Sequence, residues 1–86
     1  MASHDISFVG ETVLVTGAAA GIGKACAEAF AAAGAQVALS DINGEKCEAA
    51  ARGIAHATGA KTISIPADVA DEEACVALVN KTVDAF

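Results

Sequence analysis

The sequence predicts an α/β fold in which parallel strands alternate with helices. Three short runs typical of strands, at 12–16, 36–40 and 62–65, are each followed by a longer segment whose apolar residues recur at three- and four-residue steps. Strands that alternate with helices are joined by right-handed crossovers, which makes the sheet parallel and covers it with helices. With 86 residues, the chain forms one domain at most.

The first strand and helix are separated by a glycine-rich turn. The strand, 12–16, is a short continuous apolar run, which is typical of a strand covered on both faces, and it ends at Gly17. A helix follows the glycines, and Gly34 is well placed to end it. The spacing of apolar residues predicts that the buried face of this helix consists of Ile22, Cys26, Ala29, Phe30 and Ala33.

The second strand and helix follow directly. The strand, 36–40, stops at Asp41, and the helix over about 45–57 is closed by Gly59. The predicted buried face of this helix consists of Cys47, Ala50, Ala51 and Ile54.

The third strand, 62–65, is ended by Pro66. A third helix is expected to begin near Asp71, whose carboxylate can cap it. Its predicted buried face consists of Cys75, Leu78, Val79, Val83 and Phe86.

Composition and charge exclude several classes of protein. The chain is 55% hydrophobic, which is too apolar for a disordered segment. Its net charge of −6 argues against nucleic acid and against an anionic membrane surface as partners. Residues 1–10 contain no basic and apolar leader, and no apolar run is long enough to span a membrane, so we expect a cytoplasmic protein.

The cysteines and histidines do not suggest a metal site. Cys26, Cys47 and Cys75 are widely spaced and contain no C-x-x-C pair, so we expect small buried hydrophobic side chains in a reducing cytosol. His4 and His56 have no companion ligands in the sequence, and both are expected at the surface.

The turn Thr16-Gly17-Ala18-Ala19-Ala20-Gly21-Ile22-Gly23 is a candidate phosphate site. The first N–H groups of a helix have no partner inside the helix, and the helix dipole adds about half a positive charge there. Glycines allow a sharp turn and a close approach of the backbone to a pyrophosphate. The turn therefore predicts a site for a phosphorylated cofactor.

Other glycine patterns fit the turn less well. The pattern G-x-G-x-x-G fails because Cys26 occupies the third glycine position. A P-loop needs four residues between its glycines and a hydroxyl after its lysine, but here five residues intervene and Ala25 follows Lys24. A turn that serves packing alone is a further alternative. A methyltransferase needs a different, acidic glycine-rich signature.

The remaining pattern, T-G-x-x-x-G-I-G, resembles the cofactor turn of the short-chain dehydrogenase/reductases. The resemblance extends from about Phe8 to Phe86 and includes the lead-in strand, the run 40–43 at the position that reads the adenosine ribose, and the Asp68-Val69 pair at the position that holds the adenine. It implies a Rossmann-type β-α-β-α-β-α half of a doubly wound parallel sheet, truncated before the fourth strand. The chain is then a partial dinucleotide-binding domain covering 1–86, with its first strand at an exposed edge.

The end of the second strand predicts the choice of cofactor. Asp41 lies 18 positions beyond Gly23, where a carboxylate can accept hydrogen bonds from both ribose hydroxyls and repels a 2′-phosphate. Ala20 and Ile42 stand where an NADP site would need a basic residue, so we expect NAD rather than NADP. The predicted cofactor-binding residues are Gly17, Ala19, Ala20, Gly21, Ile22, Gly23, Asp41, Ile42, Asp68 and Val69.

The resemblance also implies where the reaction takes place. The family's catalytic Tyr, Lys, Ser and Asn lie beyond Phe86, and this chain contains no tyrosine, so we assign no catalytic residue to it. The expected function is the cofactor-binding portion of an oxidoreductase that acts on an alcohol or ketone, with the 86-residue chain itself inactive. The full-length protein is expected to be a homo-oligomer. Hydroxysteroid dehydrogenases, sugar dehydrogenases and 3-oxoacyl carrier-protein reductases share the pattern. A non-catalytic nucleotide-binding or redox-sensing module is the alternative.

Overall fold

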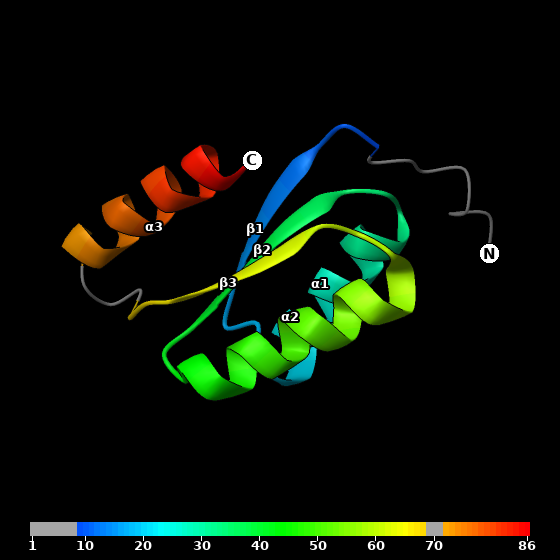
Figure 1. The fold of residues 1–86 in the computed structure, drawn as a ribbon. Helices are drawn as coiled ribbons and strands as arrows, with labels where there is room; N and C mark the ends of the chain where they lie inside the picture. The colour runs from blue at the N-terminus through cyan, green and yellow to red at the C-terminus, as the bar shows by residue number, and fades with distance from the viewer. Residues whose placement is uncertain (1–8, 69–71) are drawn as a thin grey trace.

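The computed structural model describes residues 9–68 and 72–86, which form a three-stranded parallel sheet with helices on both faces (Figure 1). The strand order is β1-β2-β3, so β2 is central and β1 lies at one edge. This confirms the predicted α/β class and the edge position of the first strand. The elements in chain order are β1 (Thr12–Thr16), α1 (Gly21–Ala32), β2 (Gln36–Asp41), α2 (Gly44–Thr58), β3 (Thr62–Pro66) and α3 (Glu72–Ala85).

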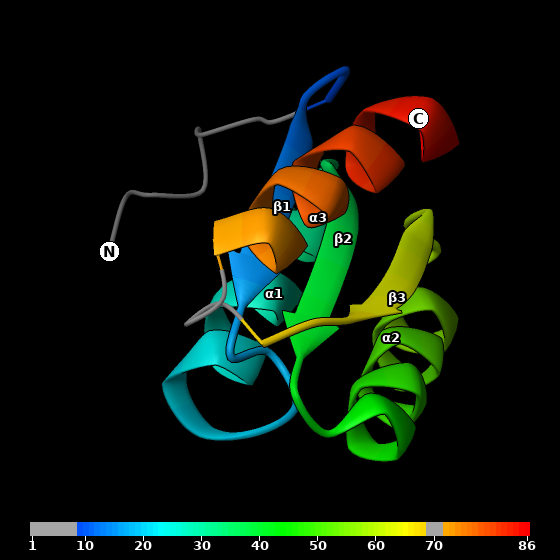
Figure 2. The ribbon, with the colours of Figure 1, turned by 90° about the vertical axis from the view of Figure 1, so that its left-hand side faces the viewer.

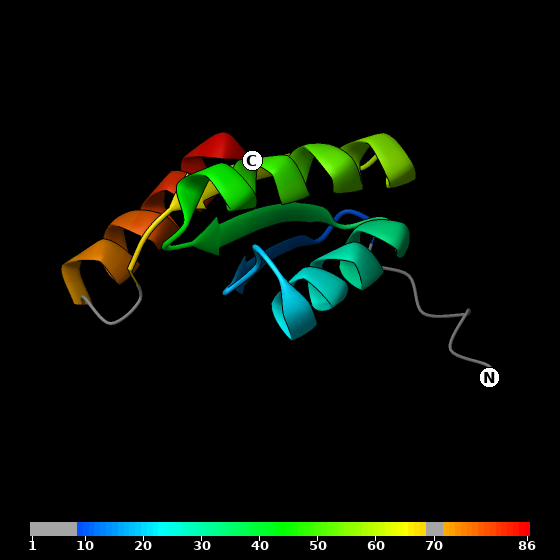
Figure 3. The same cartoon turned by 90° about the horizontal axis from the view of Figure 1, so that it is seen from below.

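The helices are divided between the two faces of the sheet. Figure 2 shows α3 in front of the strands and α1 and α2 behind them, and Figure 3 shows α1 and α2 side by side. The larger core lies on the α1–α2 face, where Val37 and Leu39 of β2 are completely buried against the small side chains of the two helices. Its central position, covered on both faces, makes β2 the most completely buried strand of the three.

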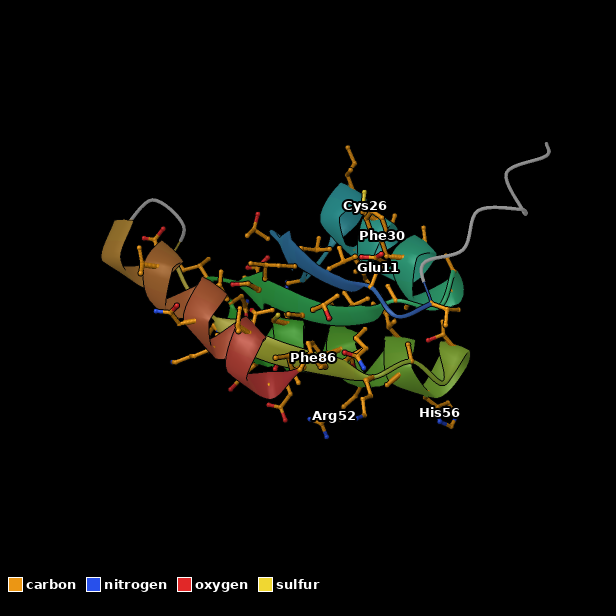
Figure 4. The ribbon with its side chains drawn as sticks, turned by 90° about the horizontal axis from the view of Figure 1, so that it is seen from above. Glu11, Cys26, Phe30, Arg52, His56 and Phe86 are labelled. Atoms are coloured by element: carbon orange, nitrogen blue, oxygen red, sulfur yellow. The ribbon has the colours of Figure 1, made fainter. Side chains whose placement is uncertain are left out.

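The buried face of α1 differs from the predicted one. Ala27 and Ala31 are buried. Of the residues predicted to be buried, Ile22, Cys26 and Ala29 are exposed, and Phe30 and Ala33 are half-buried. The cause is Gly23, because a Cβ there would overlap the carbonyl oxygen of Gly17. This close approach fixes the rotation of the helix and turns Ile22, one residue earlier, toward solvent. The expectation that Cys26 is buried was therefore wrong. Figure 4 labels Cys26 and Phe30 on α1.

The C-terminus of α1 confirms the predicted role of Gly34. This glycine has a φ of 103°, its N–H donates to the carbonyl of Ala31, and the N–H of Ala35 donates to that of Phe30. These are the two hydrogen bonds of a Schellman motif, which favours glycine at this position. The motif turns the chain directly from α1 into β2.

The helix α2 has the predicted buried face. Cys47, Ala50, Ala51 and Ile54 are its buried residues, and Gly59 ends it with a φ of 75°. On the opposite side, Arg52 and His56 project away from the sheet, as expected for His56 (Figure 4). The Arg52 guanidinium forms a surface ion pair with Glu48 at 3.2 Å.

The helix α3 covers the other face of the sheet in part. Leu78 and Thr82 are buried there, and the Thr82 hydroxyl donates to the carbonyl of Leu78 at 2.8 Å. Val83 was predicted to be buried but is exposed, because Leu78 and Thr82, one helical turn apart, lie on the buried face of α3 instead. The Asp71 cap and the side chains of Cys75 and Val79 lie outside the described residues. No helix in the described ranges is long and apolar enough to cross a membrane.

Candidate functional site

The glycine turn lies where β1 meets α1, at the end of the sheet to which the strands point (Figure 2). Gly17 and Gly21 both have a φ of 62°, a left-handed conformation that strains residues with a side chain. Gly23 is needed for a different reason. A Cβ at this position would lie 2.7 Å from the carbonyl carbon of Gly17 and 3.2 Å from the carbonyl oxygen of Thr16. The three glycines together bring α1 against β1.

The N-terminus of α1 is not closed by any side chain. Ala20 is the N-cap residue and has extended backbone angles, but it provides no side-chain hydrogen bond. The first turn of α1 also contains no acidic residue. The first-turn N–H groups therefore remain available to an anion, and the positive end of the helix dipole adds to the attraction.

Asp41 joins the turn to the end of β2. Its Oδ2 accepts the N–H of Ala19 at 3.1 Å, and its Oδ1 accepts the N–H of Asn43 at 2.9 Å. The pKa of Asp41 is lowered, first by the Asn43 N–H and then by the Ala19 N–H, with a smaller contribution from the charge of Lys46. The side chain thus carries a negative charge at the turn, with lone pairs left over for further donors.

The end of β3 adjoins the same place. The N–H of Ala67 donates to the main-chain carbonyl of Asp41 at 3.1 Å, which sets Asp68 beside the end of β2. Ile42 follows Asp41 and is 73% exposed, and Ile22 at the start of α1 is 85% exposed. Large apolar side chains with this exposure suit contact with the faces of a ligand's rings.

The predicted site residues therefore divide into three segments that meet at one end of the sheet. The six predicted residues of the turn and helix start are joined to Asp41 by the Ala19 hydrogen bond, and Asp41 is joined to the end of β3 by the Ala67 hydrogen bond. Val69 lies outside the described residues. The sequence alone did not predict the hydrogen bond between Ala19 and Asp41, because it links two residues 22 positions apart.

Two buried side chains lie close to Asp41 in the sequence. Cys47 is fully buried, and burial together with the charge of Asp41 raises the pKa of its thiol. A thiol that stays protonated is a weak nucleophile, so Cys47 acts here as a packing residue. Ser40 is also fully buried, and its hydroxyl has no hydrogen-bond partner within the described part of the chain.

A separate groove of about 440 Å³ lies between α1 and α2. Its apolar lining consists of alanines, Gly53 and Ile54, and its polar lining residues are Lys24, Glu28 and Thr58. None of the glycines of the turn lines it. No cluster that could hold a metal ion occurs in residues 9–68 and 72–86. The end of the sheet at Asp41 is therefore the better candidate site.

Solved structures of two oxidoreductases share this fold. A hydroxysteroid dehydrogenase from Escherichia coli superposes with a TM-score of 0.90 at 32% identity, covering 96% of this chain and 34% of that one. L-Sorbose reductase from Gluconobacter frateurii, complexed with NADPH and L-sorbose, superposes with a TM-score of 0.91 at 32% identity, covering 95% of this chain and 31% of that one.

Sequence comparison agrees with the structural comparison. The chain is 48% identical over 80 residues to the bovine (Bos taurus) 15-hydroxyprostaglandin dehydrogenase [NAD(+)], covering 90% of this chain and 29% of the relative. It thus spans less than a third of the length of that curated relative. The family model described as short chain dehydrogenase matches residues 11–86. The chain therefore belongs to the short-chain dehydrogenase family and corresponds to the N-terminal portion of its oxidoreductases.

Proposed function

We propose that this chain is the NAD-binding portion of a dehydrogenase that acts on an alcohol or ketone. The observation that carries the proposal is the uncapped N-terminus of α1 beside the charged carboxylate of Asp41. A pyrophosphate would lie on the N–H groups at Gly21, Ile22 and Gly23, and the adenosine ribose would donate to Asp41. The adenine would lie between Ile42 and the Asp68-Val69 pair.

The same residues favour NAD over NADP. A 2′-phosphate would lie beside the Asp41 carboxylate, whose lowered pKa keeps it charged, and like charges repel. Ala20 and Ile42 offer no cation to offset this repulsion. The relatives themselves differ, since the bovine relative carries NAD(+) in its name and the sorbose reductase structure contains NADPH. The proposed preference for NAD therefore rests on Asp41, Ala20 and Ile42 of this chain and not on its relatives.

The reaction of the parent protein is proposed from its family. It would transfer a hydride between a carbinol carbon and NAD, with catalytic side chains that lie outside residues 1–86. The 86-residue chain alone would then bind the cofactor without catalysing hydride transfer, and the parent would work as a homo-oligomer in the cytoplasm. A Tyr-x-x-x-Lys segment in the reading frame after the codon for Phe86 would support an enzyme. A parent without it would support a non-catalytic nucleotide-binding or redox-sensing module.

Calorimetric titration of the chain with NAD and with NADP tests the cofactor assignment. We expect NAD to bind about tenfold or more tightly than NADP, the factor that corresponds to ~1.4 kcal/mol. The matched variant is Ile42→Arg, because Ile42 is exposed and the new cation can pair with a 2′-phosphate. This variant should gain affinity for NADP and leave folding unchanged. Tighter binding of NADP than NAD by the unaltered chain would contradict the proposal.

A further inference from the structure

Two hydrogen bonds join the glycine turn to the end of β2. The N–H of Ala18 donates to the main-chain carbonyl of Ser40 at 3.0 Å, and the N–H of Ala19 donates to Oδ2 of Asp41 at 3.1 Å. Residues 17–23 of the turn and helix start carry no polar side chain, so acceptors elsewhere must position its main-chain donors. Of these two bonds, only the one to Asp41 depends on a side chain.

The carboxylate of Asp41 is itself held in place. Its other oxygen, Oδ1, accepts the N–H of Asn43 at 2.9 Å, so the side chain bridges the turn and the start of α2. Hydrogen bonds to an ionised acceptor are about twice as strong as neutral ones. The bridge therefore fixes the position of Ala19 relative to two elements.

The turn needs this support because glycine gives it backbone freedom. Gly17 and Gly21 lie on either side of the alanines, and both adopt a φ of 62°. Glycine loses more conformational freedom on ordering than any other residue. A turn that is already ordered before the ligand arrives avoids that loss at the binding step.

We infer that Asp41 is a positioning residue for the glycine turn, which it holds in the binding conformation through the Ala19 N–H before any cofactor arrives. This role rests on the proposed function, but it is separate from the contact with the ribose. Loss of the Asp41 side chain should weaken even ligands that have no ribose hydroxyls. A substitution of Asp41 meant to admit NADP would then also disturb the phosphate site.

The first test uses the unliganded 86-residue chain. The amide N–H signals of Ala19 and Asn43 are followed by NMR between pH 2 and 7. We expect both signals to titrate together, with an apparent pKa below the ordinary Asp value of 3.8, because both N–H groups donate to one carboxylate. In Asp41→Asn this titration should vanish. An Ala19 signal that does not follow the Asn43 signal would overturn the inference.

The control for this test is Thr62→Val. Thr62 lies at the start of β3, at the opposite end of the strands, where its hydroxyl donates to the carbonyl of Ala51 at 2.8 Å. The variant also loses one hydrogen bond from a side chain to the main chain, but it leaves the turn untouched. Its Ala19 signal should titrate as in the unaltered chain. If this titration vanished as well, the signal would report global stability, and the inference would fall.

The second test measures the binding of 2′,3′-dideoxy-ADP, which has a diphosphate but no ribose hydroxyl. Asp41→Asn and Asp41→Ala are both neutral, but only the asparagine keeps an oxygen that can accept the Ala19 N–H. We expect the asparagine variant to bind the analogue about fivefold more tightly than the alanine variant, as the loss of one hydrogen bond implies. Equal affinities would show that Asp41 acts only on the ribose.

The two proposals can fail separately. If the unaltered chain binds neither ADP nor NAD, the proposed function fails, and the amide titration still decides whether Asp41 holds the turn. If ADP binds but the Ala19 signal does not titrate, only the inference about the turn fails. If Asp41→Ala does not fold, as judged by circular dichroism, the titration in the unaltered chain remains decisive.

Discussion

The helices α1 and α2 begin at the same end of the sheet, but their N-termini are built differently. α2 begins after Asn43, whose Oδ1 accepts the N–H of Lys46 at 3.1 Å, and its first turn contains Glu45. α1 begins after Ala20, which provides no cap, and its first turn contains no acidic residue. One N-terminus is satisfied by its own side chains and the other is left open.

This difference shows which helix start is available to a ligand. Capping and acidic residues stabilise a helix N-terminus, so their absence at α1 costs stability in the free protein. The glycines add to this cost, because they lose more conformational freedom on folding. The open N-terminus of α1 is the one that a cofactor phosphate can complete. Four substitutions or conditions test this comparison.

Gly23→Ala should have the largest effect. Its Cβ would overlap the carbonyl group of Gly17, so α1 must move away from β1 and the turn must change shape. We expect the free energy of unfolding to fall by about 3 kcal/mol and NAD binding to be lost. Urea unfolding and calorimetric titration would measure both. The control is Gly53→Ala in α2, where a Cβ meets open space and should stabilise the chain by about 0.5–1 kcal/mol. If the two substitutions changed the free energy of unfolding and NAD binding equally, the close approach of Gly23 to Gly17 would have no special effect.

Ala20→Asp should convert the start of α1 into one like that of α2. Ala20 already has extended N-cap angles, so the new carboxylate can accept a first-turn N–H and stabilise the free chain by about 1 kcal/mol. The same carboxylate would occupy the anion site, and NAD should bind about tenfold or more weakly. Thermal unfolding should show a higher midpoint, and titration with NAD should show a lower affinity. The neutral cap in Ala20→Ser should weaken binding less, and a gain in NAD affinity in Ala20→Asp would contradict the comparison.

Asn43→Ala should remove the cap of α2. The N–H of Lys46 would lose its side-chain acceptor, so we expect the free energy of unfolding to fall by about 1 kcal/mol. Urea unfolding measures the change. Ala20→Gly at α1 removes no hydrogen bond and should change stability by only a few tenths of a kcal/mol. Similar losses in the two variants would mean that the two N-termini are not different after all.

The pH dependence of stability should show the smallest effect. The folded-state pKa of Asp41 is lowered by the N–H groups of Asn43 and Ala19, so its contribution to stability is fully present above about pH 4 and is lost as the pH falls through the folded pKa. The thermal midpoint of the unaltered chain should therefore exceed that of Asp41→Asn above about pH 4, and the two should converge at lower pH. A difference that grows as the pH falls would have the wrong sign.

The sequence was sufficient for the order and type of the elements. The strand Thr12–Thr16, the end of α1 at Gly34 and the buried face of α2 were all predicted, because each depends on local signals such as β-branched runs, glycine at a helix end and helical spacing. The positions of the turn glycines and of Asp41 in the sequence were also sufficient to nominate the site. These signals are local, or they repeat with the period of the element that contains them.

Only the tertiary structure decided how α1 faces the core and how the site is held together. Apolar spacing alone placed Ile22 and Cys26 inside, but the contact between Gly23 and Gly17 turns both to the surface. The hydrogen bond from Ala19 to Asp41 joins two segments that only the parallel pairing of β1 and β2 brings together. Spacing along one helix cannot reveal where a neighbouring strand approaches most closely, because that distance is set by the packing of the whole sheet.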